Sequence, residues 1–279
     1  MPIISTLASA SANGYGFSGG PFRLAISSNQ TDLNLNSFLI SSGWNGAAEV
    51  IVTINSGVYI SSTSTANAAL TISGSFPSGV SVTNNGTIVG MGGAGGHGGG
   101  TGYYYYWFSD APTSGGAGGL GLSVSSAVTF TNNGTIAGGG GGGGGGCAAF
   151  ETAIPGAGGG GGQSSYSTNS VGGRIGLVGV TPAAYSTAGT NGTYSAAGTG
   201  GTGGYAGGSC CGVYNWQQAG GGGNGGTWAN SGSAGSQMSS SYGTSYTQSP
   251  GSGGSAGGAV TGNSNITWIS TGTRYGSIT

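Results

Sequence analysis

Residues 130–149 read FTNNGTIAGGGGGGGGGCAA, with nine consecutive glycines from Gly138 to Gly146. The glycine run follows a short apolar segment and an Asn-Asn-Gly turn signal, a combination typical of a β-strand and its turn. The same order of features occurs earlier, in VTNNGTIVGMGGAGGHGGG at 82–100. An internal repeat of this kind indicates an architecture in which similar elements stack.

The composition distinguishes this chain from a flexible linker. Glycine accounts for 71 of the 279 residues, a fraction that usually indicates low complexity. Disordered chains, however, combine low hydrophobicity with high net charge, whereas this chain is 35% hydrophobic and has a formal net charge of −1. Its glycines are also interleaved with tyrosine and tryptophan, unlike those of a Gly/Ser linker. We therefore expect the glycine-rich part to be ordered.

The glycine run needs a source of stability other than side-chain burial. Fixing a backbone costs roughly 1–2 kcal/mol per residue, and glycine loses more conformational freedom than any other residue. A polyproline-II-type helix directs its amides and carbonyls outward, so bare helices of this kind can hydrogen-bond side by side. Each such bond contributes about 0.5–1.5 kcal/mol. The run is thus predicted to be the interior of a lattice, spanning about 28 Å.

Glycine-rich tracts alternate with segments of another composition. The tracts are residues 90–102, 115–121, 138–146, 156–162, 198–208, 219–226 and 251–258. The segments between them are predicted to be loops: residues 103–114, 147–155, 163–197, 209–218 and 227–250. Before residue 90 the pattern favours strands, with Val-, Ile- and Thr-rich runs in 48–62 and 69–90 and an alternating LNLNSFLI at 33–40.

The predicted fold is a β-rich N-terminal part plus a bundle or sandwich of packed polyglycine-II helices, with little or no α-helix. No interval has an apolar period of 3.6 residues over more than two turns. Three regions are expected: an N-terminal attachment or assembly domain at 1–83, a polyglycine-II sandwich with aromatic loops at 84–262, and a closing C-terminal strand at 263–279.

The aromatic loops carry the candidate binding residues. YYYYWF at 103–108 places six aromatic residues between two glycine tracts. Tyrosine and tryptophan provide rigid contact area with a polar group and are enriched at recognition surfaces. Exposed aromatic patches usually mark interaction sites, although some rings are expected to cap the lattice ends. The candidates are Tyr103, Tyr104, Tyr105, Tyr106, Trp107, Phe108, Tyr166, Tyr185, Tyr214, Trp216 and Tyr242.

The charge pattern excludes several classes of partner. The chain has no lysine, and its only cations are Arg23, Arg174 and Arg274. A nucleic-acid partner is not expected, because binding to phosphates needs a basic surface. Membrane insertion is not expected either, because no stretch approaches 18 apolar residues. The N-terminus lacks the basic and apolar regions of a signal peptide.

Catalysis, cofactors and metals are not expected. His97, the only histidine, is flanked by glycines without a neighbouring carboxylate, so we interpret it as a surface side chain at the edge of a tract. Asp110 and Glu151 are carboxylates that two adjacent loops could pair, but nothing else indicates a sugar-cleaving cleft. The cysteines, Cys147 and the adjacent Cys210 and Cys211, are interpreted as small buried thiols.

Three stretches together resemble a known family: GTIVGMGGAGGHGG at 86–99, GTIAGGGGGGGGG at 134–146 and NITWISTGTRYGSI at 265–278. They are similar to glycine-rich phage tail proteins, among them the tail-fibre tip adhesins of T-even-type phages. The resemblance covers roughly residues 70–279. It implies a non-enzymatic adhesin in the virion tail, extracellular after host lysis, whose polyglycine-II sandwich presents loops to a bacterial receptor.

The implied partners are a bacterial outer-surface protein or glycan, and other tail or virion proteins that contact residues 1–69. The family carries a tryptophan-rich docking segment, whereas residues 1–69 of this chain contain only Trp44. One alternative is therefore another tail component with the same module. A second is a structural virion or extracellular fibre subunit whose aromatic loops mediate self-assembly into a homo-oligomer. A third is an ice-binding protein, since polyglycine-II bundles can be flat.

Overall fold

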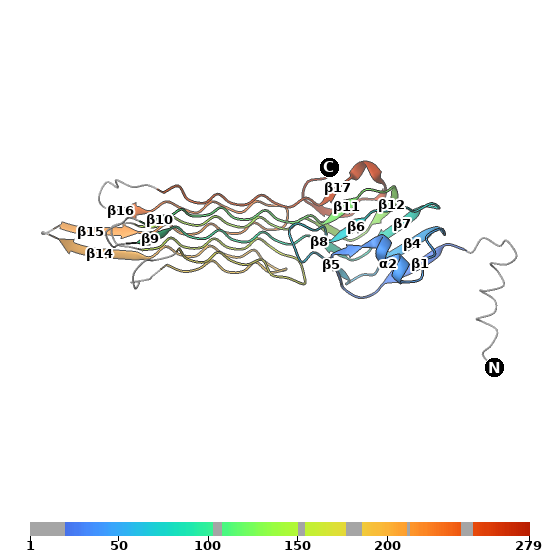
Figure 1. The fold of residues 1–279 in the computed structure, drawn as a ribbon, viewed down its shortest axis with the longest axis horizontal. Coiled ribbons are helices and arrows are strands. Elements are labelled where there is room, and N and C mark those ends of the chain that lie inside the picture. Colours follow the sequence, from blue (N-terminus) through green and yellow to red (C-terminus); the bar gives the residue numbers. More distant parts are fainter. Residues whose placement is uncertain (1–19, 103–107, 150–153, 177–185, 211–212, 241–247) are drawn as a thin grey trace, which may run out of the picture.

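The computed structural model describes residues 20–102, 108–149, 154–176, 186–210, 213–240 and 248–279. The molecule is elongated and has three parts in a row (Figure 1). Parallel sheets form one end, wavy glycine-rich tracts run side by side through the middle, and short antiparallel strands lie at the far end. In the part of the chain described, no helix has the length and apolarity needed to cross a membrane.

The sheet end is a three-sided parallel solenoid. The first sheet contains β1 (Phe22–Ile26), β4 (Val50–Ile54), β7 (Val80–Asn84), β12 (Val128–Asn132) and β18 (Ile266–Ser270). The second contains β2 (Gln30–Thr31), β5 (Tyr59–Ser61), β8 (Thr87–Val89), β13 (Thr135–Ala137) and β19 (Thr273–Tyr275). The third contains β3 (Leu33–Asn34), β6 (Leu70–Ile72), β11 (Leu122–Val124) and β17 (Val260–Thr261). The chain visits the sheets in the same order on each turn, so equivalent strands stack.

Alternating apolar residues fill the solenoid. Strands β4, β7 and β12 share the same pattern, in which buried residues alternate with half-buried ones. Their inward side chains stack in register, as Val52, Val82 and Phe130 do. A face packed on the core requires this period of two residues. The prediction of a β-rich fold with little helix is confirmed.

One helix replaces a predicted strand. The alternating LNLNSFLI at 33–40 favoured a strand, but only β3 at its start is extended, and α2 (Leu35–Ser41) follows directly. Asn34 caps this helix, its side-chain oxygen accepting a hydrogen bond from the Ser37 amide at 3.1 Å. Leu35 and Leu39, four residues apart, are both buried, so the same residues satisfy a helical period.

The TNNGTI repeat is one turn of the solenoid stacked on the next. Asn84 and Asn132 occupy equivalent, fully buried corners between the first and second sheets. The Asn84 amide donates to the Asn132 side-chain oxygen at 2.8 Å, and the Asn132 amide donates to the Thr271 carbonyl at 2.8 Å. A buried amide needs such partners. The chain then enters the glycine tracts directly after β8 and β13 (Figure 1).

The glycine-rich region is inserted into two successive solenoid turns. The chain leaves the second sheet after β8 and returns at β11 in the third, and it leaves after β13 and returns at β17. Residues 122–137 therefore pair with strands from both the N-terminal and C-terminal parts of the chain. The predicted division into regions 1–83, 84–262 and 263–279 stays a prediction. Strands from all three regions pair with one another in the solenoid.

The central tract, residues 138–146, is hydrogen-bonded on all sides. Gly138 donates to Tyr275 of β19. From Gly139 onward, every third amide donates to the same neighbouring tract, and the accepting tracts are residues 113–119, 157–163 and 230–233. The tracts that donate to its carbonyls are residues 93–99, 223–226 and 251–257. For example, Gly93 and Gly96 donate to Gly140 and Gly143, each at 2.8 Å. A three-residue repeat is that of a polyproline-II-type helix.

Steric contact explains why the central tract consists of glycine alone. All nine residues are buried. A Cβ added at Gly142 would lie 1.9 Å from the Ala94 carbonyl oxygen, and one at Gly145 would lie 1.8 Å from the His97 carbonyl oxygen. The remaining seven positions would bring a Cβ within 2.1 Å of a neighbouring backbone oxygen. The bare backbone is therefore a requirement of packing, as at the crowded axis of collagen.

Outer tracts carry a side chain at every third residue, and many of these side chains satisfy edge amides. In tract 91–99 the outward residues are Met91, Ala94 and His97. His97 is exposed at the edge, as predicted, and its Nδ1 accepts from the Arg174 amide at 3.2 Å. Ser, Thr and Asn side chains accept in the same way from Thr202, Thr199, Asn224, Gly221, Gly172 and Gly200.

Part of two predicted loops belongs to the lattice. Residues 163–197 and 227–250 were expected to be loops, but residues 170–176, 187–193 and 230–236 make the same inter-tract backbone hydrogen bonds as the glycine runs. Their sequences contain few adjacent glycines, because an outer tract needs glycine only where it faces a neighbour. The composition-based loop assignment was therefore wrong for these residues.

The C-terminal segment closes the solenoid with two strands rather than the single one predicted. The 3-10 helix η1 (Asn263–Asn265) precedes β18, and β19 follows. The Trp268 indole donates to the Asn263 side-chain oxygen at 2.8 Å, and the Arg274 guanidinium lies 5.1 Å from the centre of the Trp268 ring. These contacts tie the last solenoid turn together.

The far end of the lattice carries antiparallel strands. β9 (Gly100–Gly102) pairs with β10 (Phe108–Asp110). β15 (Val213–Gln218) pairs with both β14 (Tyr205–Cys210) and β16 (Ser239–Ser240). Both groups lie at the end of the molecule opposite the solenoid (Figure 1).

Candidate functional site

The tip is the set of turns at the far end of the lattice; its described residues are 100–102, 108–112, 147–149, 154–155, 205–210, 213–218, 237–240 and 248–250. These turns come from chain segments far apart in sequence. The glycine tracts bring them together, because the tracts run side by side and end at the same end of the bundle (Figure 1).

A small apolar cluster anchors the base of the tip. Ala149, Ile154 and Ala219 are buried together, with Met238 packed against them. Ala149 and Ile154 exchange two backbone hydrogen bonds, of 2.8 and 3.0 Å. Cys147 is buried beside them, as predicted for a packed thiol, and its Sγ donates to the Gln248 carbonyl at 3.1 Å. Burial raises the pKa of the Cys147 thiol, which keeps the sulfur neutral.

One aromatic pair is described on the tip surface. Tyr205 and Trp216 stack with ring centres 6.0 Å apart and an interplanar angle of 27°. Tyr205 begins β14, is opposite Gln218 of β15 and is 52% exposed. The pair therefore presents an aromatic surface at the side of the hairpin, which is the chemistry the aromatic loops predicted.

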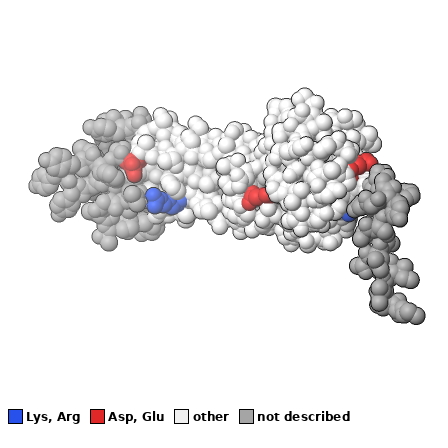
Figure 2. Space-filling view, turned by 45° about the vertical axis from the view of Figure 1, so that its right-hand side comes forward, with Lys and Arg blue, Asp and Glu red and all other residues white. Residues whose placement is uncertain are grey.

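The chain has only three Arg and four Asp or Glu residues, and few charged side chains appear among the described residues on the face shown in Figure 2. One small hollow at the tip, of about 170 Å³, includes Asp110, His97 and Arg174 in its lining. No group of three or more His, Cys, Asp or Glu side chains comes together among the described residues. Glu151, the carboxylate considered as a partner of Asp110, lies outside the described residues.

The predicted binding residues fall into three groups. Tyr103, Tyr104, Tyr105, Tyr106, Trp107, Tyr185 and Tyr242 lie outside the described residues. Phe108, Tyr214 and Trp216 lie in tip strands β10 and β15. Tyr166 is not at the tip: it stacks on Tyr59 of strand β5, with ring centres 4.2 Å apart, where the lattice meets the solenoid.

The junction cluster, Tyr59, Tyr166, Tyr194, Trp228 and Tyr275, is a feature that the sequence did not predict. Tyr194 lies edge-on to Tyr59 at 5.1 Å and to Trp228 at 5.0 Å. Burial, followed by a hydrogen bond with Tyr59, raises the pKa of Tyr194 to about 12. Nearby, Ser167 and Ser61 share a hydrogen bond of 2.8 Å. The cluster joins the turns of the lattice to the solenoid.

Comparisons with known proteins agree with this architecture. The family model described as phage tail fibre adhesin Gp38 matches residues 21–279. Among solved structures, the crystal structure of the gp37-gp38 adhesin tip complex of the bacteriophage S16 long tail fiber resembles the chain with a TM-score of 0.58 and 22% identity. The match covers 98% of this chain and 92% of that one. A search of curated proteins gave no match.

The family match and the arrangement of scaffold and tip lead to one conclusion. The adhesin hypothesis is confirmed, and a tail-fibre adhesin acts in the virion tail by recognising a host receptor. The chain belongs to the phage tail fibre adhesin Gp38 family.

Proposed function

We propose that the glycine-rich tracts are polyglycine-II helices and that their lattice is a stiff support which presents the tip to the receptor. The support for the helix assignment is the three-residue hydrogen-bond repeat of the central tract. The single observation that carries the functional proposal is the gathering of tip strands from distant segments at the end opposite the solenoid (Figure 1).

Rigidity is the mechanism by which this support contributes to binding. Ordering a flexible loop on binding costs free energy, and a loop held in place beforehand avoids that cost. The tip turns are anchored at their bases by the cluster of Ala149, Ile154 and Ala219 and by backbone bonds of the tracts that lead into them. Sequence changes in such loops leave the support unaltered.

Receptor contacts are proposed for the predicted aromatic residues 103–108, Tyr185, Tyr214, Trp216 and Tyr242. Of these, Phe108, Tyr214 and Trp216 lie in described tip strands, and the structure adds Tyr205, the partner of Trp216. Tyr166 is assigned to the junction instead, because it stacks on the solenoid residue Tyr59. With so few charges on the surface, we expect contacts by rings, hydroxyls and amides to a bacterial outer-surface protein or glycan.

Attachment to other tail proteins is proposed for the opposite end, within residues 1–69. The matched structure is a complex of gp37 with gp38. In this chain, β1 to β5 and α2 fall within that range and build the first turns of the solenoid. Separate ends for fibre and receptor would allow both partners to bind the same molecule.

Adsorption to bacteria tests the tip assignment. A fluorescent fusion of the whole chain is incubated with a panel of strains, and cell-bound fluorescence is measured for the wild type and for a variant with residues 103–108 replaced by Ser and Gly. We expect the variant to lose adsorption while keeping the wild-type circular dichroism spectrum. Tyr166→Ser, at the junction, serves as the control and is expected to adsorb normally. Loss with Tyr166→Ser but not with the 103–108 variant contradicts the proposal.

A further inference from the structure

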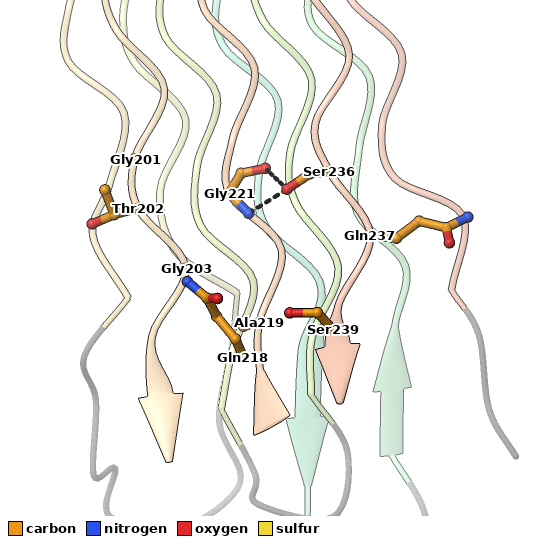
Figure 3. Close-up of a pocket in the computed structure, with 9 residues that line it drawn as sticks. All are labelled: Gly201, Thr202, Gly203, Gln218, Ala219, Gly221, Ser236, Gln237 and Ser239. Atoms are coloured by element: carbon orange, nitrogen blue, oxygen red, sulfur yellow. Dashed lines mark hydrogen bonds between the residues drawn. The ribbon is translucent and has the colours of Figure 1, made fainter. Parts of the chain in front are cut away.

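A polar cleft of about 320 Å³ lies on the side of the molecule, at the base of the tip (Figure 3). It is formed where tracts 198–204, 219–226 and 230–236 meet strands β14 to β16. Gly221 lies at its centre, and Thr202, Gln218, Ser236 and Ser239 are among the residues that line it. The volume is at the lower end of the range for small-molecule sites.

Gly221 is a glycine that the lattice does not require. At every other tract glycine whose surroundings are described, an added Cβ would lie 3.1 Å or closer to a neighbouring atom. At Gly221 the nearest atoms would be the Gly201 carbonyl oxygen at 3.4 Å and the Ser236 Oγ at 3.6 Å, which is ordinary van der Waals contact. The missing side chain therefore opens a space rather than relieving a clash.

Gly221 occupies an outward position of its tract, where the three-residue repeat would place a side chain. Asn224, three residues later in the tract, points its side-chain oxygen at the Gly200 amide, at 2.9 Å. Gln218, three residues earlier, is exposed. The Gly221 amide donates to the Ser236 Oγ at 2.7 Å, so the cleft floor is a satisfied backbone that holds its shape (Figure 3).

The described residues that line the cleft are uncharged, and an aromatic pair shares a sheet face with one of them, Gln218. Thr202, Gln218 and Ser239 offer hydroxyl and amide groups, which donate as well as accept hydrogen bonds. Tyr205 of β14 and Ser239 of β16 are both directly opposite Gln218 of the central strand β15. All three side chains therefore share one face of this three-stranded sheet. Trp216, two residues from Gln218, lies on that face too and stacks on Tyr205.

From this arrangement we infer that the cleft binds a neutral saccharide unit of a bacterial surface glycan. A sugar ring presents hydroxyls that match amide and hydroxyl groups, and an apolar C–H face that matches an aromatic ring. Among the described residues that line the cleft none is charged, which disfavours phosphate and carboxylate ligands. The inference rests on the proposed receptor-binding role of the tip and names the ligand class for one part of it.

Saturation-transfer NMR on the whole chain tests the inference, with the methyl glycosides of glucose, galactose, mannose and N-acetylglucosamine as probes at millimolar concentration. We expect transfer to at least one of them. Gly221→Asn fills the cleft and is expected to weaken that binding about tenfold or more. Gln218→Leu, which removes an amide without touching the lattice, is expected to weaken it as well. Ser255→Asn, an exposed outward position on another tract, is the matched control and should bind as the wild type does.

The outcomes separate this inference from the proposed function. Absence of transfer to all four probes, or equal transfer in the wild type, Gly221→Asn and Gln218→Leu, overturns the saccharide site. Loss of cell adsorption in Gly221→Asn without transfer to any probe would show that the cleft takes a protein side chain, which also overturns it. The proposed function is decided independently by the adsorption of the 103–108 variant.

Discussion

The solenoid and the glycine lattice solve the same problem in opposite ways. In the solenoid, side chains such as Phe130 fill the space between three sheets. In the lattice, side chains are removed so that backbones touch, and each buried amide of residues 139–146 has a carbonyl partner in another tract. Hydrophobic burial is non-directional, whereas the lattice relies on directional bonds at fixed spacing. The lattice should therefore tolerate added volume far less well than the solenoid.

The largest effect is expected from one methyl group in the lattice centre. Gly142→Ala would place its Cβ 1.9 Å from the Ala94 carbonyl oxygen, and neighbouring tracts on every side prevent it from moving away. We expect the free energy of unfolding to fall by about 4–5 kcal/mol or more, an exceptional loss for a single methyl group. Guanidinium chloride unfolding followed by circular dichroism measures it.

Gly221→Ala is the matched control for that variant. Its Cβ meets nothing closer than 3.4 Å, so the free energy of unfolding should stay within about 0.5 kcal/mol of the wild type, as for ordinary surface changes. Equal stability of the two variants would show that the lattice gives way to added volume, and the distinction between the two regions would be lost.

Truncation of a core side chain in the solenoid should lower the free energy of unfolding by somewhat less. Phe130→Ala empties a fully buried site between Val82 and Trp268. We expect a loss of about 3 kcal/mol, in the lower part of the usual range for this change, because Trp268 is only half-buried and can shift toward the cavity. Thr129→Ala, on the outward face of the same strand, should change the unfolding free energy little. A smaller loss for Phe130→Ala than for Thr129→Ala contradicts the assigned core.

Edge amides of the lattice should each contribute a modest amount. Ser236→Ala removes the side-chain acceptor of the Gly221 amide. The expected loss is about 1 kcal/mol, the net value of one hydrogen bond, because water can reach this exposed edge. Ser255→Ala, also exposed on an outer tract, has no side-chain hydrogen bond among the described residues and is the control. Indistinguishable melting temperatures for the two variants would show that edge hydroxyls do not stabilise the lattice.

The smallest effect concerns the junction between the two regions. Because the pKa of Tyr194 is raised to about 12 in the folded protein, folding favours the neutral phenol. Its contribution is fully present below the ordinary tyrosine value of 10 and is lost as the pH rises from about 10 through about 12. The melting temperature of the wild type should fall more steeply over this interval than that of Tyr194→Phe. Parallel curves would show that Tyr194 ionises no differently in the folded and unfolded chains.

The sequence predicted the lattice better than it predicted the solenoid. Nine bare glycines leave backbone-to-backbone packing as the one way to hold the segment, so local reasoning sufficed. The solenoid depends on pairings such as Val52 with Val82, which join segments far apart in the chain, and no local pattern specifies them. The side chains at every third position of 91–99, those of Met91, Ala94 and His97, did carry a readable signal for an outer tract.

The position of Tyr166 shows what composition leaves out. As a tyrosine in a segment between glycine tracts it was predicted to contact the receptor, but tract 138–146 runs outward from the solenoid and tract 156–162 runs back. The next turn must therefore lie at the solenoid end. Because successive tracts alternate in direction, counting the tracts along the sequence would have placed Tyr166 at the solenoid end. The length of each tract and the identity of its neighbours depend on three-dimensional packing and could not be read from the sequence.

Amide hydrogen exchange in residues 139–146 tests the central claim most directly. Every amide of this segment donates to a carbonyl of another tract and is buried, so we predict exchange as slow as that of solenoid strands β7 and β12. Peptide-level mass spectrometry of the intact protein measures both regions in one experiment. Exchange of the glycine segment at the rate of an unstructured chain, with the solenoid protected, would contradict the account.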